Sequence, residues 1–175
     1  MGAWEELDTE IEVTVETDDI DTVLNMDDEF GVFEPVQEYL KNVKRGFEEG
    51  GKEGALDVAR RNKSFQQQFI FRNCDNPSGM LATSIEYEGS DYHYLIGTRI
   101  NHIYPMSVEY GRKGFEPIPP TKALAFYYQG ELIFRKRVGE AKPRPFVAPA
   151  YEVTGKIADE IVLRKINIAI ARYSD

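Results

Sequence analysis

The chain has 175 residues, 42% of them hydrophobic, which predicts one domain large enough to bury a core. No stretch approaches the roughly 20 apolar residues of a membrane helix, and the N-terminus lacks the basic start and apolar core of a secretion signal. Cys74 is the only cysteine, which excludes an internal disulfide and predicts assembly in a reducing cytoplasm.

Charge is distributed unevenly along the chain. The formal net charge is -9, and fourteen of the 30 acidic residues precede Lys41, so residues 41–175 hold 16 acidic and all 21 basic residues. We therefore divide the chain into an acidic N-terminal arm, residues 1–34, and a domain of residues 35–175. The arm is either solvated and partly disordered, or it contacts a neighbour or lines a passage for DNA, because acidic groups repel phosphate. The acids predicted to face a lumen or a neighbour are Glu10, Glu12, Glu16, Asp18 and Asp19.

The first periodic patterns predict a strand and then a helix. Ile11, Val13 and Val15 alternate with polar residues, which is typical of an edge strand, paired either within this subunit or with the next. From Pro35 the apolar residues follow a helical spacing. Glycines at 46, 50, 51 and 54 are expected to weaken or break this helix, with a second helical piece from 55 to 60 that ends near Asn62.

The middle of the chain favours strands. We expect a short apolar run at 69–71, a turn at 73–79, a strand at 81–87, a turn at 89–91, and alternating strands at 92–98 and 104–110. A long loop follows at 111–122, and then a hairpin of 123–128 and 132–138. Val153, Ile157, Ile161 and Ile168 share a helical stripe near the C-terminus. The predicted fold is α+β: a mostly antiparallel β-sheet packed by an N-terminal helix and a long C-terminal helix, with an acidic N-terminal arm.

Catalytic and metal-binding patterns are incomplete. Residues 46–52 have the spacing of a phosphate-binding loop, but Glu53 occupies the position of the magnesium-binding Ser or Thr. His93, Asp91 and His102 match no known metal-ligand spacing, and neither Ser84 nor Ser107 lies in a nucleophile elbow. We therefore predict no enzyme activity, no cofactor and no metal; an enzyme whose site includes the two histidines is the weaker alternative.

Three segments in a fixed order resemble the head–tail joining, or tail-completion, proteins of long-tailed phages. They are Ser78-Gly79-Met80-Leu81-Ala82-Thr83-Ser84-Ile85, then Tyr104 through Val108-Glu109-Tyr110-Gly111, and Pro143-Arg144-Pro145-Phe146-Val147-Ala148-Pro149-Ala150 before the last helix. The resemblance covers about residues 36–172. It departs from the family pattern in the long acidic arm and at Arg112, where threonine is usual.

The resemblance implies a structural virion protein, assembled in the host cytoplasm, in which copies form a ring in the phage neck. The ring would connect portal-side or adaptor proteins to tail terminator or tail tube proteins, with DNA passing through and no sequence-specific binding or membrane contact. The residues predicted for the subunit interface are Glu109, Tyr110, Gly111, Arg112, Phe115, Arg144 and Phe146.

The motif residues also have physical roles of their own. Phe146 lies between prolines and is expected to dock the last helix on the sheet. Arg144 is expected to bind a carboxylate, with Glu109 as one candidate, and Gly111 to end its strand where a side chain would clash.

The alternative function is a non-enzymatic module that binds a peptide or a nucleic acid through a tyrosine-rich sheet face. Seven tyrosines between Tyr87 and Tyr128 suggest it. Aromatic residues in strands also serve ordinary cross-strand packing, and tyrosines also anchor protein interfaces.

Overall fold

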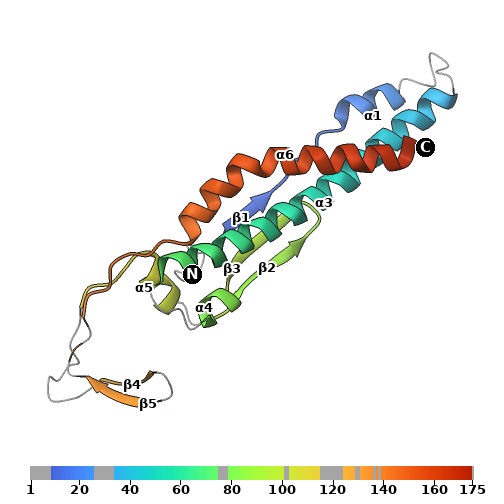
Figure 1. The fold of residues 1–175 in the computed structure, drawn as a ribbon. Helices are drawn as coiled ribbons and strands as arrows, with labels where there is room; N and C mark the ends of the chain where they lie inside the picture. The colour runs from blue at the N-terminus through green and yellow to red at the C-terminus, as the bar shows by residue number, and fades with distance from the viewer. Residues whose placement is uncertain are drawn as a thin grey trace.

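The structure is a computed structural model that describes residues 9–25, 34–74, 79–100, 103–114, 124–128, 131–135, 137 and 139–174. The architecture is α+β, as predicted: a three-stranded antiparallel sheet, two long helices and a separate two-stranded hairpin (Figure 1). Among the described residues, none of the helices is both long and apolar enough to span a membrane.

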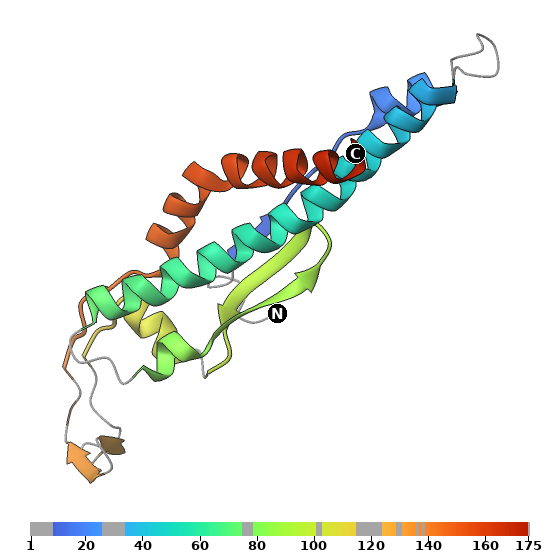
Figure 2. The same cartoon turned by 45° about the vertical axis from the view of Figure 1, so that its right-hand side comes forward.

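Helix α3 (Glu34–Asn73) is the axis of the molecule, with the sheet on one side and α6 (Val147–Ser174) on the other (Figure 2). The predicted break at the glycines is wrong, because α3 continues through them for 40 residues. The short apolar run at 69–71, expected in the strand-rich middle of the chain, lies in the last turns of α3 instead. Apart from the buried glycines at 46, 50, 51 and 54, the buried positions of α3 follow the three- and four-residue spacing of one helical face: Ala55, Val58, Ala59, Asn62, Gln66 and Ile70.

The glycines of α3 allow α6 to approach it closely. A Cβ atom placed on Gly50 would overlap the backbone of Ile166 on α6. The same holds at the neighbouring turns, where Gly46 faces Ile170 and Gly54 faces Val162. The two helices therefore run antiparallel with their backbones nearly in contact, and this packing offsets the low helix propensity of glycine.

The predicted C-terminal helix is confirmed as α6, with a different buried stripe near its end. Ile161 is buried as expected, but Ile168 is 44% exposed, and Ile166 and Ala169 are buried in its place. Near the end of α6, Arg172 donates to Glu53 of α3 at 2.7 Å, and this bond holds the pKa of Glu53 below its usual value.

The main sheet has the order β1-β3-β2, with β1 (Thr9–Glu12), β2 (Ile85–Ser90) and β3 (His93–Thr98) antiparallel to one another. The predicted first strand is confirmed in part, and its partner belongs to the same chain. One face of the sheet is buried against α3 through Ile11, Ile85, Tyr94 and Ile96. The turn between β2 and β3 falls at residues 91 and 92, later than predicted.

Two predicted strand segments are helical. Residues 80–83 form the short helix α4 (Met80–Thr83), so the strand begins only at Ile85. The alternating set at 104–110 forms α5 (Ile103–Glu109). Its buried positions, Pro105 and Glu109, lie one helical turn apart, which gives the segment a helical rather than an alternating burial pattern.

The described part of the acidic arm belongs to the fold. Strand β1 joins the sheet, and α1 (Asp18–Asn25) lies beside the first half of α3 (Figure 1). Lys44 of α3 bonds to Asp21 of α1 at 2.5 Å. Residues 9–25 are thus not a disordered arm, while residues 1–8 and 26–33 lie outside the described part.

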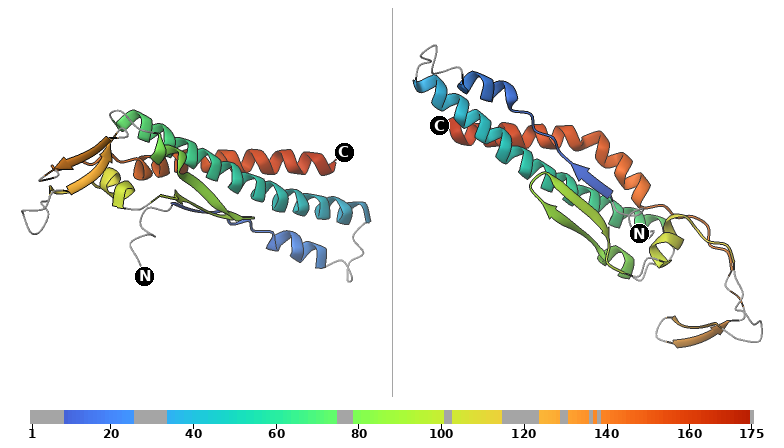
Figure 3. Two further views of the ribbon diagram at one scale, coloured as in Figure 1. Left: turned by 90° about the horizontal axis from the view of Figure 1, so that it is seen from below. Right: turned by 180° about the vertical axis from the view of Figure 1, so that it is seen from behind.

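The predicted hairpin is confirmed as β4 (Leu124–Tyr128) and β5 (Glu131–Arg135). Two extended segments, 111–114 and 139–145, leave the body side by side and lead toward the hairpin, and together they form a stalk. The hairpin lies apart from the body at the end of this stalk (Figures 1 and 3). The predicted loop residues 115–122, with the predicted interface residue Phe115, lie outside the described residues, as do His102 and most of the turn at 73–79.

Candidate interface site

The N-terminus of α6 is capped by a side chain from α5. Glu109 is only 4% exposed, and its carboxylate accepts the backbone N–H groups of Phe146 at 2.6 Å, Val147 at 3.0 Å and Ala148 at 3.2 Å. The first amides of a helix have no partner within it, and the helix dipole favours a negative charge at this end. One carboxylate therefore accepts hydrogen bonds from three backbone amides, and the positive end of the helix dipole compensates its negative charge.

Phe146 anchors the same junction in the core. It is fully buried and belongs to the cluster that includes Ile85, Ile96 and Ile161. This confirms that Phe146 docks the last helix on the body. The side chains of Phe146 and Glu109 are both buried within the chain, and their predicted role as contacts to a neighbouring subunit stays a prediction.

Gly111 begins the stalk in a conformation that favours glycine. Its φ is 74°, and a Cβ atom there would lie 2.6 Å from the carbonyl oxygen of Ala141. The predicted clash is confirmed, although Gly111 follows a helix rather than a strand. Next to it, Arg112 and Ala141 exchange two backbone hydrogen bonds of 2.9 Å, which hold the two segments of the stalk together.

The other predicted interface residues surround this junction. The backbone N–H of Arg144 donates to the carbonyl of Val108 at 2.7 Å, and Arg112 and Arg144 are both half-buried. Tyr110 is 55% exposed. Among the described residues of the predicted set, Tyr110 therefore offers the most accessible large side chain at the base of the stalk.

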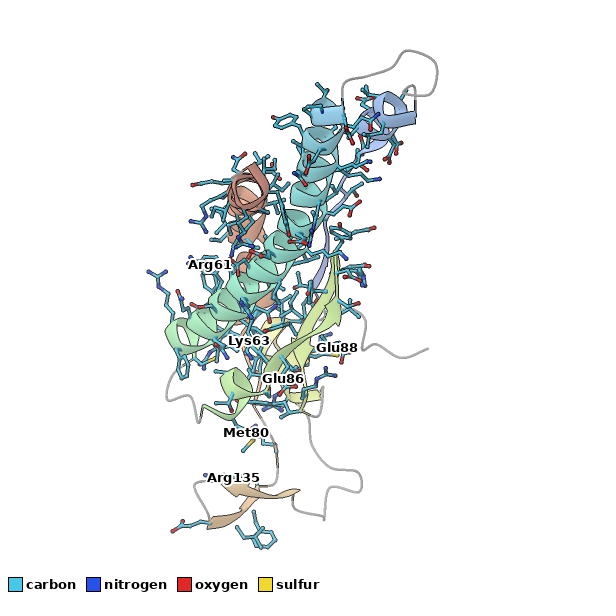
Figure 4. All side chains as sticks on the ribbon, turned by 90° about the vertical axis from the view of Figure 1, so that its right-hand side faces the viewer. Arg61, Lys63, Met80, Glu86, Glu88 and Arg135 are labelled. Carbon is cyan, nitrogen blue, oxygen red and sulfur yellow. The ribbon has the colours of Figure 1, made fainter. Side chains whose placement is uncertain are left out.

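The outer face of the main sheet is acidic. Its side chains point away from α3, because residues alternate between the two faces of a strand. The acids on this face, all exposed, are Glu10 and Glu12 of β1 and Glu86 and Glu88 of β2 (Figure 4 labels the β2 pair).

Two basic side chains partly balance these acids. Arg99 bonds to Glu88 and, at 3.3 Å, to Glu86; the bond to Glu88 is the main reason that the pKa of Arg99 is raised. His93 Nε2 lies 2.7 Å from Glu10 Oε1. Glu86 and Glu88 are not among the residues predicted for an acidic surface, although their alternation with Ile85 and Tyr87 is a usable signal.

The acids predicted to face a lumen or a neighbour separate into two groups. Glu10 and Glu12 lie on the outer face of the sheet, whereas Asp18 and Asp19 lie in the first turn of α1, with Glu16 just before it. All five are exposed. The acidic outer face of the sheet therefore includes Glu10 and Glu12 of β1 but not Asp18 and Asp19 of α1.

The tyrosines of the sheet do not form an exposed face. Tyr94 is 7% exposed, and its ring packs edge-to-face against Tyr87 at 6.2 Å between centroids. Arg60 and Lys63 of α3 cover Tyr87 from the inner side. The tyrosine-rich binding face of the alternative function is therefore wrong for these strands.

In the described part of the chain, no group of three or more His, Cys, Asp or Glu side chains is arranged to hold a metal ion. His93 lies on the outer sheet face and pairs with Glu10. The comparisons with protein-family models, curated proteins and solved structures find no match for this chain.

Proposed function

We propose that this chain is a structural protein of the phage neck, whose copies form a ring that joins the DNA-filled head to the tail. The observation that carries the proposal is the contact between two of the three segments behind the family resemblance. Glu109 from the second segment caps the helix that begins with Phe146, Val147 and Ala148 from the third. Residues 37 to 39 positions apart in the chain thus act as one unit, which is expected of a true motif and not of scattered coincidences.

The shape of the subunit supports assembly. The body carries a stalk and hairpin that extend away from it (Figure 1), so the chain presents different surfaces at its two ends. Subunits that join through unlike surfaces form heterologous contacts, which close into rings when the rotation allows.

The negative charge of the protein supports a role in lining a passage for DNA. The net charge is -9, and the outer sheet face adds a local group of acids at Glu10, Glu12, Glu86 and Glu88. Phosphate is repelled by such a surface, whereas DNA-binding proteins use Lys and Arg. The proposed partners are neighbouring proteins of the head and tail, with DNA as cargo that passes without being bound.

Inactivation of the gene in a virus that carries it tests this function. The expected result is an accumulation of DNA-filled heads and separate complete tails, seen by electron microscopy, with infectivity restored by the wild-type gene supplied in trans. Normal virions without the protein would exclude the neck function.

A further inference from the structure

A groove lies between the free edge of β1 and helix α6. Its volume is about 430 Å³, and its lining comes from β1, α3 and α6. The apolar side chains of Ile11, Val58 and Ala158 line it together with the charged Glu10 and Glu12. Figure 3, right panel, shows β1 as the strand of the sheet nearest α6. This volume is in the range of roughly 300–1,000 Å³ typical of ligand pockets, so the groove can accept bulky side chains.

One edge of β1 is unpaired among the described residues. Its other edge bonds to β3, and the ladder continues with the N–H of Val13 donating to Tyr92 at 2.9 Å. Because backbone groups of successive residues point to opposite edges, those of Glu10 and Glu12 point to the free edge. A row of unpaired backbone donors and acceptors is a template for another strand.

The hairpin has the opposite property: among its described side chains, two apolar ones of β5 are exposed. Leu132 is 47% exposed and Phe134 is 62% exposed, and the hairpin lies away from the body in Figures 1, 2 and 4. A lone two-stranded hairpin is marginally stable in water. It therefore gains stability from any surface that covers its apolar side chains.

We propose that β5 of one copy docks on the free edge of β1 in a second copy, where it adds a fourth strand to the sheet and fills the groove. The inference rests on the proposed function for the closed ring, and it gives that ring a specific subunit contact. The contact is heterologous, because the hairpin of each copy meets the groove of the next.

The alternation of β5 fits this position. Leu132 and Phe134 share one face of the strand, and Arg135 lies on the other, four residues from Glu131 at the opposite end of β5. With the apolar pair directed into the groove, Arg135 comes to the outer face of the sheet, beside Glu10 and Glu12. Opposite charges on neighbouring strands stabilise the pairing, and the lengths match, with four residues in β1 and five in β5.

The other edge of the sheet is a poorer site for the hairpin. Both acids of β2 already bond to Arg99, whereas on β1 Glu10 lies against the weaker base His93, so an incoming arginine has less to gain on β2. The groove also opens beside β1 and is not lined by β2. Both differences favour β1.

A mixing experiment with the full-length protein tests the contact. The hairpin variant L132D/F134D keeps the groove, and the edge variant E10K/E12K keeps the hairpin. Each variant alone is expected to remain monomeric, whereas their mixture forms a dimer with twice the monomer mass, measured by sedimentation velocity at the concentration where the wild type associates. Circular dichroism checks that both variants fold. Adding R135E to the edge variant is expected to restore its self-association.

Cross-linking gives a second measurement that needs no stable oligomer. In a Cys74→Ser background, E12C and R135C are expected to yield intermolecular products with a short bis-maleimide, and E88C with R135C serves as the matched control on the other edge. Equal products from both pairs, or none from the first at the highest soluble concentration, would overturn the docking proposal.

The docking proposal and the neck function can fail separately. If L132D/F134D still supports joining of heads to tails, the docking proposal is wrong and the neck function stands. If gene inactivation leaves virions normal, the neck function is wrong, and the cross-linking result still decides whether copies dock through the hairpin.

Discussion

At the scale of single residues, the surroundings of Glu109 explain why a carboxylate is stable in a buried position. An isolated buried charge is costly, but here three backbone N–H groups and the positive end of a 28-residue helix surround it. The same side chain also fixes where α6 begins relative to α5. A residue that the sequence marked as an interface contact is thus a positioning residue for the base of the stalk.

Loss of this cap should destabilise the whole domain. We expect Glu109→Gln to lower the free energy of unfolding by about 1–2 kcal/mol, because it removes the charge and one acceptor. Glu109→Ala leaves the amides unsatisfied and should cost about 3 kcal/mol. Urea denaturation measures both, with Glu160→Gln on the exposed side of α6 as the matched control. A loss no larger than that of the control would contradict the capping role.

At the scale of elements, the packing of α3 on α6 depends on the absence of side chains at the crossing. Gly50 faces the backbone of Ile166, which cannot move as the end of a flexible side chain can. Gly155 of α6 is the opposite case, since a Cβ atom there would meet nothing within 4 Å. The two glycines lie in the same helix pair, so they form a natural comparison.

The same substitution should have opposite effects at these two positions. Gly50→Ala should destabilise the protein by about 1–3 kcal/mol, because overpacking forces the helices apart. Gly155→Ala should stabilise it by about 0.5–1 kcal/mol through helix propensity alone. Thermal unfolding of the two variants measures the difference. Stabilisation by Gly50→Ala would mean that the helices are not in close contact at this turn.

The α+β class, the hairpin and the last helix could be predicted from the sequence, because their apolar periods are regular. The length of α3 could not, since its four central glycines indicated a break and Asn62 and Gln66 interrupt its apolar face. Both are fully buried, and they bond to each other at 2.8 Å, while Asn62 also donates to Thr154 of α6 at 3.1 Å. Buried polar side chains with partners fit a core, but a single sequence does not reveal the partners.

Helix α5 and the cap show a second limit of sequence patterns. Four alternating residues from 104 to 110 match a strand, yet the same residues fit two turns of helix. Pro105 in the first turn was the available signal, because proline is tolerated there and costs a strand a ladder hydrogen bond. The Glu109 cap, in contrast, depends on a contact across 37 residues that no local pattern encodes.

At the scale of the whole molecule, docking of the hairpin and the acidic sheet face are geometrically compatible. A strand that joins the edge of β1 extends the sheet sideways, brings Arg135 beside Glu10 and Glu12, and leaves Glu86 and Glu88 of β2 on the outer face. Repetition around a ring would then place the acids of successive sheets on one continuous surface. If that surface faces the central axis of the ring, DNA in transit meets repeated negative charge and does not adhere.

Charge reversal on this face tests its orientation. We expect virions with Glu86→Lys and Glu88→Lys to eject DNA more slowly than the wild type, because lysines facing the axis bind phosphate, and the delay should shrink as salt concentration rises. These residues lie on β2, away from the proposed docking edge, so assembly should be normal. Glu152→Lys with Glu160→Lys on exposed positions of α6 changes the net charge equally and serves as the control. Unchanged ejection kinetics in the β2 variant, or the same delay in both, would show that the sheet does not line the passage.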